Sequence, residues 1–350
     1  MARFHERRLR PTPSNTQMPR KKIVSPSTRA FVREAKKLRH FSLFDALHGY
    51  VYARWTYFYI GVGTGEHPLT KGVRPIYEAL TRLMRVVRPD AGAARAGKSN
   101  GDEPGREPPV TFADTYHGKV VPLDAATKLV TVNKDINLGD LEKIIPYALA
   151  RDLVLNHPDH IVLLQCPCRT SREKPCTPLD VCLIVGEPFA SFMAEHHGGR
   201  TRWITAAEAV EILRAEDERG HVHHAFFKDA MLGRFYAICN CCSCCCGAMQ
   251  AQRNGTPMLA SSGYVSSVNE ELCVGCGECA KFCQFGALGV LDAKNAVDTA
   301  ACMGCGVCVT KCEHGALSLE RDPHKGMPLE IGELMNDALR QEVAAPAGRN

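Results

Sequence analysis

Eighteen cysteines are the residues of this chain best suited to chemistry, and eight of them form two matched runs in the C-terminal part. Each run has the spacing C-x-x-C-x-x-C-x-x-x-C. The runs consist of Cys273, Cys276, Cys279 and Cys283, and of Cys302, Cys305, Cys308 and Cys312. Thiolates at this spacing are typical ligands of [4Fe-4S] clusters, whereas structural zinc usually takes pairs of C-x-x-C. We therefore expect two [4Fe-4S] clusters here and not zinc.

The two runs belong to an internal repeat, because the segments from Cys273 to Leu288 and from Cys302 to Leu317 match at a constant offset of 29 residues. The repeat predicts an α+β module with pseudo-twofold symmetry. Both runs resemble those of bacterial-type 2[4Fe-4S] ferredoxins. This resemblance implies that the fourth cysteine of each run binds the other cluster. The implied ligand sets are Cys273, Cys276, Cys279 and Cys312 for one cluster, and Cys302, Cys305, Cys308 and Cys283 for the other. Gln284 and Glu313 depart from the pattern, since proline usually follows the fourth cysteine.

Ten further cysteines precede these runs, and six of them fall within eight residues. Such density favours metal binding over packing, and we expect one or two further Fe–S clusters. The candidate ligands are Cys166, Cys168, Cys176, Cys239, Cys241, Cys242, Cys244 and Cys245. The alternatives are a redox-active disulfide and a structural role. Adjacent cysteines are not expected to reach one site without strain, and Cys182 is interpreted as an ordinary buried thiol.

Two kinds of polar residue accompany these cysteines. His221, His223 and His224 are candidate Fe–S ligands, although a structural role in the core or at the surface is the favoured interpretation. Arg169 follows Cys168 directly, so it either places a positive charge beside an anionic site or forms an ordinary salt bridge.

The elements around the second set of cysteines predict an α/β or α+β fold for residues 111–262. We expect a helix from Leu141 to Leu155 capped by Asp140, and short buried strands at residues 161–164 and 182–185. Thr205 and Glu208 form a capping-box signature for a helix over residues 206–219, which Gly220 would close. Alternating strands and helices indicate a sheet with helices against it.

The remaining segments divide by composition. Residues 1–40 carry twelve Lys and Arg against two acidic residues, a net charge of +10, and are expected to be a disordered arm. Residues 41–87 form an aromatic-rich helical segment and residues 88–110 a flexible linker. Residues 263–322 form the ferredoxin domain, and residues 323–350 a C-terminal tail. In the helical segment, a stripe at helical spacing is expected to pack on the core, with a membrane-surface or partner-docking helix as the alternative. The stripe consists of Phe41, Phe44, His48, Val51, Trp55 and Phe58.

The chain as a whole resembles 4Fe-4S ferredoxin iron-sulfur binding domain proteins with an extra cysteine-rich domain. The resemblance rests on the segments Cys166 to Arg169, Pro178 to Leu183 and Cys239 to Cys246, and it implies electron transfer. Because the sequence shows no flavin or nicotinamide signature, we expect a redox partner protein. The alternative is an oxidoreductase with a catalytic cluster in the middle domain, fed by the ferredoxin domain. Clustered thiols and the lack of a recognisable export signal favour a reducing, cytoplasmic location. Neither nucleic-acid binding nor a transmembrane segment is expected, whereas peripheral membrane contact remains an alternative.

Overall fold

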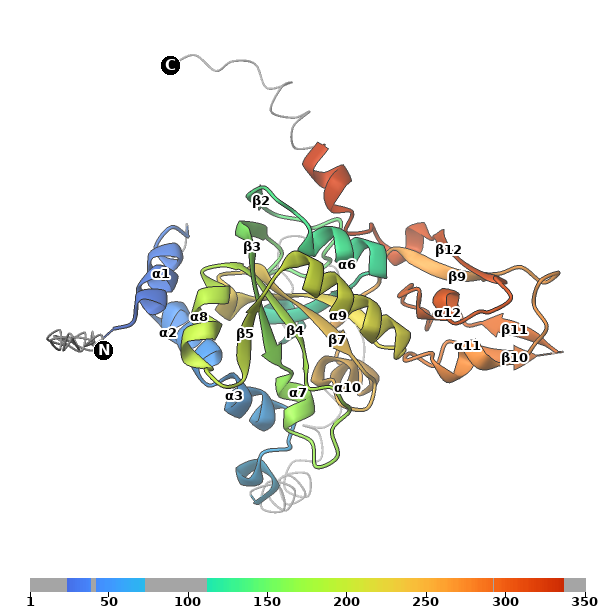
Figure 1. Cartoon of the computed structure of the whole chain (residues 1–350), viewed down its shortest axis with the longest axis horizontal. Helices are drawn as coiled ribbons and strands as arrows, with labels where there is room; N and C mark the ends of the chain where they lie inside the picture. Colours follow the sequence, from blue (N-terminus) through green and yellow to red (C-terminus); the bar gives the residue numbers. More distant parts are fainter. Residues whose placement is uncertain (1–23, 39–41, 73–111, 292, 337–350) are drawn as a thin grey trace, which may run out of the picture.

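The structure of this chain is a computed structural model that describes residues 24–38, 42–72, 112–291 and 293–336. It is a mixed α/β protein whose middle region is built around one large sheet (Figure 1). The N-terminal helices lie on one side of this sheet, and the cysteine-rich C-terminal region lies on the opposite side.

The central sheet has eight strands, in the order β2-β3-β4-β7-β6-β1-β8, with β5 paired to β3. Neighbouring strands run antiparallel except β1 and β8. Because β4 runs opposite to both β3 and β7, the carboxyl ends of β3 and β7 meet the amino end of β4 at one edge of the sheet. The strands are β1 (Tyr116–Val120), β2 (Ile136–Leu138), β3 (Leu153–Gln165), β4 (Asp180–Glu187), β5 (Thr201–Ile204), β6 (Val222–Lys228), β7 (Arg234–Cys241) and β8 (Leu259–Ala260).

Helices cover both faces of this sheet, because alternate residues of each strand point to opposite sides. Val162 and Leu164 of β3 face the core that α1, α2 and α8 cover. Ile161 and Leu163 face the core that α6 and α9 cover. The helices that precede the C-terminal region are α1 (Pro26–Ala35), α2 (Leu43–Arg54), α3 (Thr56–Gly63), α5 (Phe112–Thr115), α6 (Leu123–Val130), α7 (Pro167–Thr170), α8 (Phe189–His196), α9 (Ala206–Glu218) and α10 (Gly247–Arg253), with a 3-10 turn η3 (Asp229–Met231).

Several elements predicted from local pattern are confirmed. Residues 161–164 lie in β3 and residues 182–185 lie in β4. Helix α9 begins as expected, because the Glu208 backbone N–H donates to Thr205 Oγ1 at 3.2 Å. It ends before Gly220, which adopts a φ of 81° that glycine accommodates without a Cβ clash.

The helix predicted over Leu141–Leu155 is wrong. Residues 141–150 form turns, and Leu153 is already the first residue of the long strand β3. Asp140 and Ala150 have φ values of 55° and 57°, which a right-handed helix does not contain. Pro146 also lacks the N–H that a helix interior needs. Pairing with β2 places Leu153 and Leu155 in the sheet core, and this packing outweighs local helix propensity.

The expectation of a disordered arm over residues 1–40 is wrong for residues 26–35, which form α1. Ser25 caps this helix, and Phe31 is fully buried against Phe192 of α8, with ring centroids 5.6 Å apart. One buried aromatic side chain therefore anchors this part of the basic segment. Residues 1–23 and the predicted linker at 88–110 lie outside the described residues.

The prediction that the aromatic stripe packs on the core is wrong for its described phenyl and indole side chains. Phe44, Trp55 and Phe58 are 75%, 48% and 50% exposed. The reason is a break at Trp55, where α2 ends and α3 begins, so the two halves do not share one face. Tyr52 and Ala53 contact the core instead. In the part of the chain that the structure describes, no helix combines the length and apolarity needed to cross a membrane.

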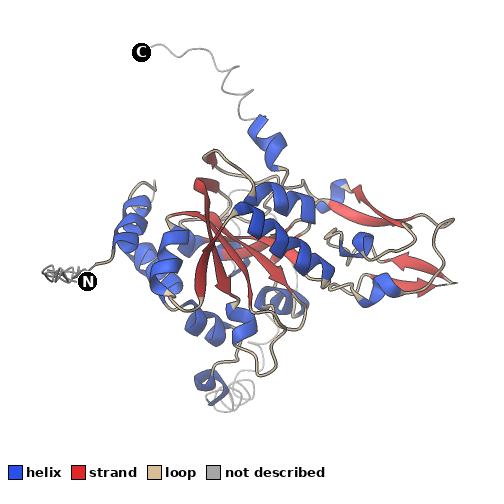
Figure 2. Cartoon of the chain, viewed as in Figure 1, coloured by secondary structure: helices blue, strands red, loops and turns tan. Residues whose placement is uncertain are grey.

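The C-terminal region consists of two short antiparallel strand pairs, β9 with β12 and β10 with β11, and two single-turn helices (Figure 2). Its elements are β9 (Tyr264–Val268), α11 (Glu278–Lys281), β10 (Leu288–Leu291), β11 (Lys294–Val297), α12 (Val307–Thr310), β12 (Leu317–Arg321) and the 3-10 turn η4 (Pro323–Lys325). The described part of the predicted C-terminal tail packs on the fold, and residues 331–336 are helical. Leu329 and Ile331 are buried in the core beneath α6 and α9, where they add apolar surface to that layer.

Candidate functional site

Two small cavities in the C-terminal region are each lined by four thiols, and each has a volume of about 20 Å³. In both cavities three thiols come from one cysteine run and the fourth comes from the other run. The structure thus brings the eight thiols together in the same two sets that the resemblance implied. These sets are Cys273, Cys276, Cys279 and Cys312, and Cys283, Cys302, Cys305 and Cys308.

Backbone N–H groups donate to the sulfur atoms of both runs. The Ala287 N–H donates to Cys283 Sγ at 3.2 Å, and the Ala316 N–H donates to Cys312 Sγ at 3.3 Å. These two hydrogen bonds are separated by the 29-residue offset of the repeat. Hydrogen bonds of this kind stabilise negative charge on sulfur and help to set the reduction potential of an Fe–S site. The backbone around these thiols therefore fits the cluster ligands that the spacing predicts.

Glycine permits the close backbone approach around each cavity. Gly275 has a φ of 66°, and a Cβ at this position would lie 2.1 Å from the backbone oxygen of Ala293. Gly304, its counterpart in the second run, is equally confined, with a φ of 64° and a backbone oxygen 2.2 Å from its Cβ position. The N–H groups of Asn295 and then Gly275 lower the pKa of Cys273. A larger residue would therefore displace the backbone that stabilises this thiolate.

Eight thiols of the middle region line a cavity at the sheet edge where β3 and β7 end. Two of them, Cys242 and Cys245, also belong to a tighter cluster described below, and we call the other six the six-thiol group. Register explains part of this convergence, because Cys182 of β4 lies directly opposite Cys239 of β7. Cys166 and Cys168 belong to the turn of α7 that follows β3. The group consists of Cys166, Cys168, Cys182, Cys239, Cys241 and Cys246.

The cavity of the six-thiol group has a volume of about 40 Å³, twice that of either C-terminal cavity. The neighbouring Cys168 thiol, together with burial, raises the pKa of Cys166 to about 12. Binding of a metal deprotonates such thiols, because the cation compensates the thiolate charge. Sulfur donors, burial and room for a group at least as large as a cubane therefore fit an Fe–S cluster.

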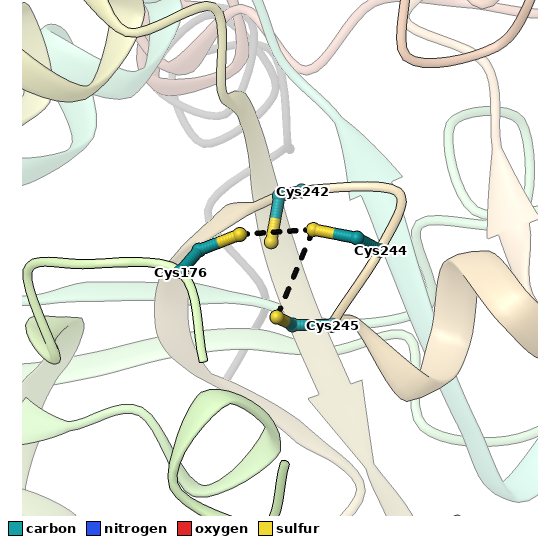
Figure 3. Close-up of side chains that lie close together, drawn as sticks. All are labelled: Cys176, Cys242, Cys244 and Cys245. Carbon is teal, nitrogen blue, oxygen red and sulfur yellow. Dashed lines mark hydrogen bonds between the residues drawn. The ribbon is translucent and has the colours of Figure 1, made fainter. Parts of the chain in front are cut away.

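The other four cysteines of the middle region form a second, tighter cluster, which we call the four-thiol group: Cys176, Cys242, Cys244 and Cys245 (Figure 3). Their sulfur atoms all lie within 4.8 Å of one another. Cys176 comes from the loop after α7, and the other three come from the turn after β7. The expectation that adjacent cysteines do not reach one site is wrong for Cys244 and Cys245, whose Sγ atoms are 3.7 Å apart. The tight turn over residues 243–245 curves the backbone around the group.

Arg169 borders the six-thiol cavity and also forms a buried ion pair. Its guanidinium donates to Glu216 Oε2 at 2.8 Å, and both side chains are 1% exposed. His221 Nδ1 lies 2.6 Å from the same carboxylate oxygen. The pKa of Glu216 lies below its usual value despite the opposing effect of burial, because His221 and Arg169 stabilise the carboxylate. The described residues that line the six-thiol cavity do not include His221, His223 or His224. The four-thiol group contains no histidine either.

One side chain joins the C-terminal region directly to the cysteine-rich turn. The Ser243 N–H donates to Gln284 Oε1 at 2.8 Å, and Gln284 Nε2 donates to the Gly220 carbonyl at 2.8 Å. Gln284 follows Cys283, so the residue that replaces the usual proline fixes its loop through hydrogen bonds.

Apolar packing accompanies this polar contact. Phe285 and Met303 line the cavity of Cys283 and its partner thiols, and they also pack against the core that contains most of the six-thiol group. Val307 of α12 is buried with Val120 and Val222 of the sheet. The two cysteine-rich regions therefore share one continuous apolar interface.

A further cavity of about 320 Å³ adjoins the six-thiol group. It shares Tyr52, Tyr116 and Cys168 with the six-thiol cavity. The Lys228 ammonium lies over the Tyr52 and Tyr116 rings, at 4.8 and 5.1 Å from their centroids. Burial lowers the pKa of Lys228, and the adjacent Asp229 opposes this effect. The wall of this cavity therefore combines an aromatic lining, one cation and one thiol of the six-thiol group.

Two thiols of the six-thiol group were missed by reasoning from the sequence. Cys182 was interpreted as an ordinary core thiol, and Cys246 was not among the candidate ligands. The density of cysteines was the available signal for Cys246. For Cys182 the signal was absent, because its place opposite Cys239 depends on the pairing of β4 with β7.

Comparison with known families identifies the C-terminal part of the chain. Residues 267–289 and 296–318 match the 4Fe-4S binding domain family, once for each half of the repeat. No protein of curated function matches the chain at a significant level. The tandem match covers both cysteine runs and thus all eight thiols of the two C-terminal cavities. Residues 267–318 are thus a 4Fe-4S binding region of the two-cluster ferredoxin type.

Proposed function

We propose that this chain is an iron–sulfur electron-transfer protein whose ferredoxin region relays electrons between an external redox partner protein and the middle region. Two [4Fe-4S] clusters would be held by the crossed sets of C-terminal thiols. The six-thiol group would hold a further cluster, with four of its thiols sufficient for a cubane. The two N–H···S hydrogen bonds at the same repeat position support pseudo-twofold symmetry of the ferredoxin region.

The observation that carries this proposal is the hydrogen bond from the Ser243 N–H to Gln284 Oε1. Gln284 is bonded to Cys283, which lines a ferredoxin cavity, and Ser243 is bonded to Cys242, which lines the six-thiol cavity. A short path of covalent bonds and one hydrogen bond thus connects the two cavities. Such contact is what an electron relay within one chain requires.

The iron and sulfide content of the anaerobically purified full chain tests the proposal. Two ferredoxin clusters account for about eight irons, and a cubane in the six-thiol group raises the total to about twelve. The Cys241→Ser variant should lose about four irons. Ser243→Ala is the matched control, because it changes the same turn without removing a thiol or the donating N–H. A wild-type content of about eight irons would contradict a cluster in the six-thiol group.

The relay itself is tested by Gln284→Ala, which removes the acceptor of the Ser243 N–H. Rapid freeze-quench EPR after mixing with dithionite should show ferredoxin signals at the normal rate and delayed reduction of the middle-region cluster. Glu313→Ala changes the equivalent position of the other run and should leave both rates unchanged. If the middle-region cluster is reduced equally fast in the Gln284→Ala variant, the path does not run through this contact.

A second candidate function is catalysis at the middle-region cluster, which the adjoining 320 Å³ cavity favours. Because Cys168 lines both cavities, a small molecule in the larger one would lie beside the cluster. An oxidoreductase would need an iron with an open coordination position. Carbon monoxide added to the reduced protein should then change the EPR signal of the middle-region cluster alone. Unchanged spectra would support the pure electron-transfer role.

A further inference from the structure

We infer that the four-thiol group binds a single tetrahedral metal ion of the Zn²⁺ type and not an iron–sulfur cluster. The structure supports this inference through the spacing of the sulfur atoms, the positions of the four ligands along the chain, and the charges around them. It goes beyond the proposed electron-transfer function and does not depend on a cluster in the six-thiol group.

The spacing of the sulfur atoms is the first argument. Four thiolates at about 2.3 Å from a tetrahedral Zn²⁺ place their sulfur atoms about 3.8 Å apart. Cys244 Sγ and Cys245 Sγ are 3.7 Å apart, which matches this separation. Cys176 Sγ and Cys244 Sγ are closer, at 2.9 Å, so binding of an ion would move the Cys176 side chain outward. All four sulfur atoms lie within 4.8 Å of one another, which is the scale of a single ion.

The ferredoxin cavities of the same chain provide an internal comparison. A cubane is larger than one ion, so its four thiolates must stand farther apart. Among the described residues, no three thiols of a ferredoxin cavity gather within the 4.8 Å that encloses the whole four-thiol group. The six-thiol group is likewise more open than the four-thiol group. The ten thiols of the middle region therefore form a cavity that accommodates a cluster and an adjoining site that accommodates one ion, with Cys242 and Cys245 at the boundary between them.

The chain supplies the four ligands from two separate segments, as structural metal sites commonly do. Three come from the turn after β7, and Cys176 comes from the loop that joins α7 to β4. The loop residues on either side of Cys176, Pro175 and Thr177, are not buried. A metal ion would therefore fasten an otherwise weakly packed loop to the end of β7.

The charge around the site also fits. A divalent ion with four thiolates carries a net charge of about −2, so neighbouring cations are favourable. The Arg253 guanidinium donates to the Ser243 carbonyl. The Arg172 guanidinium donates to the Cys245 carbonyl at 3.0 Å and also pairs with Glu66, so Arg253 is the main compensating charge. Both arginines thus lie against the turn that supplies three ligands. The bound ion would hold this turn in the conformation that presents the Ser243 N–H to Gln284.

Metal analysis of the anaerobically purified full chain tests the inference. We expect about one zinc per chain in addition to iron. Cys176→Ser should weaken zinc retention at least about tenfold and leave the iron content and EPR signals unchanged. Cys244→Ser provides a second variant with the same expected result, in case the first does not fold. Cobalt substituted at the site should show the absorption bands of tetrahedral cobalt thiolate, and these should disappear in both variants.

Cys241→Ser serves as the matched control, because its thiol belongs to the six-thiol group. It should keep the zinc and lose iron, so failure of the proposed cluster is read separately from failure of the zinc site. Absence of zinc from the wild-type protein would overturn the inference. Loss of iron from Cys176→Ser, or a Cys176–Cys244 disulfide found by mass spectrometry of the protein as isolated, would overturn it as well.

Discussion

Replacement of Arg169 by Met should destabilise the middle region, because it removes the buried one of the two guanidinium partners of Glu216 and leaves only that of Arg219, which is 46% exposed. The side chains of Arg169 and Glu216 are both 1% exposed, so water does not replace the lost interaction. Arg169 also donates to the Asn240 carbonyl at 3.0 Å and to the Pro178 carbonyl. Removal of one partner from a buried ion pair typically costs 3 to 5 kcal/mol. We expect about 3 kcal/mol, the lower end of this range, since Arg219 and His221 still contact the carboxylate at 2.9 and 2.6 Å.

Native-state hydrogen exchange of the β7 amides measures this loss without requiring two-state unfolding of the whole chain. A decrease of about 3 kcal/mol corresponds to roughly 100-fold faster exchange of these amides. Arg202→Met is the control for loss of an ion pair, because Arg202 pairs with Glu208 at the surface and is 54% exposed. Such surface pairs contribute about 0 to 1 kcal/mol.

The double variant Arg169→Met with Glu216→Leu removes both charges and should recover most of the stability. This recovery distinguishes an uncompensated buried charge from simple loss of side-chain packing. The reasoning is refuted if Arg169→Met exchanges no faster than Arg202→Met, or if the double variant is less stable than the single one.

Two further predictions concern other buried positions. Burial, with a smaller effect of Arg321, lowers the pKa of Lys119 to about 7. The unfolded state therefore binds more protons than the folded state between about pH 7 and 10.5, so stability should rise by about 2 kcal/mol from pH 7 to 9 in denaturant titrations. Lys119→Met should abolish this rise, and a parallel pH dependence in wild type and variant would contradict the assignment. Gly304→Ala should lower the iron content of the ferredoxin region, because the new Cβ would lie 2.2 Å from the Tyr264 carbonyl oxygen. Gly315→Ala has a similar φ but open space around the Cβ, so equal iron loss in the two variants would refute the steric explanation.

Local sequence signals predicted the elements that depend on near neighbours. The C-x-x-C-x-x-C spacing and the capping residues of α9 are local signals that span a few positions. In the structure, the three close cysteines of each run line one cavity, and Thr205 caps α9. The prediction of a helix from Leu141 was wrong because contacts distant in sequence determine the structure there. Residues up to 150 form turns and those from Leu153 onward join β3, because sheet pairing with distant strands determines their conformation.

The division of the ten middle-region thiols was also beyond local reasoning. Cys241 and Cys242 are adjacent in sequence, yet they belong to different groups. Their separation follows from the end of β7 and the turn after it, which depend on the strand order. Cys176 joins the four-thiol group only because its loop crosses to the same sheet edge. Sequence density thus indicated metal chemistry, whereas the number and kind of sites required tertiary structure.

The return of the chain after η4 changes how the ferredoxin region is attached. Leu329 and Ile331 are buried under α6 and α9, and the Lys119 ammonium donates to the Met327 carbonyl at 2.7 Å. The ferredoxin region is therefore an insertion between two anchored segments and not an appendage on a single tether. Two attachment points, together with the Gln284 contact, restrict rigid-body swinging. Electron transfer between the two regions would then occur at a fixed separation, without a domain movement to limit its rate.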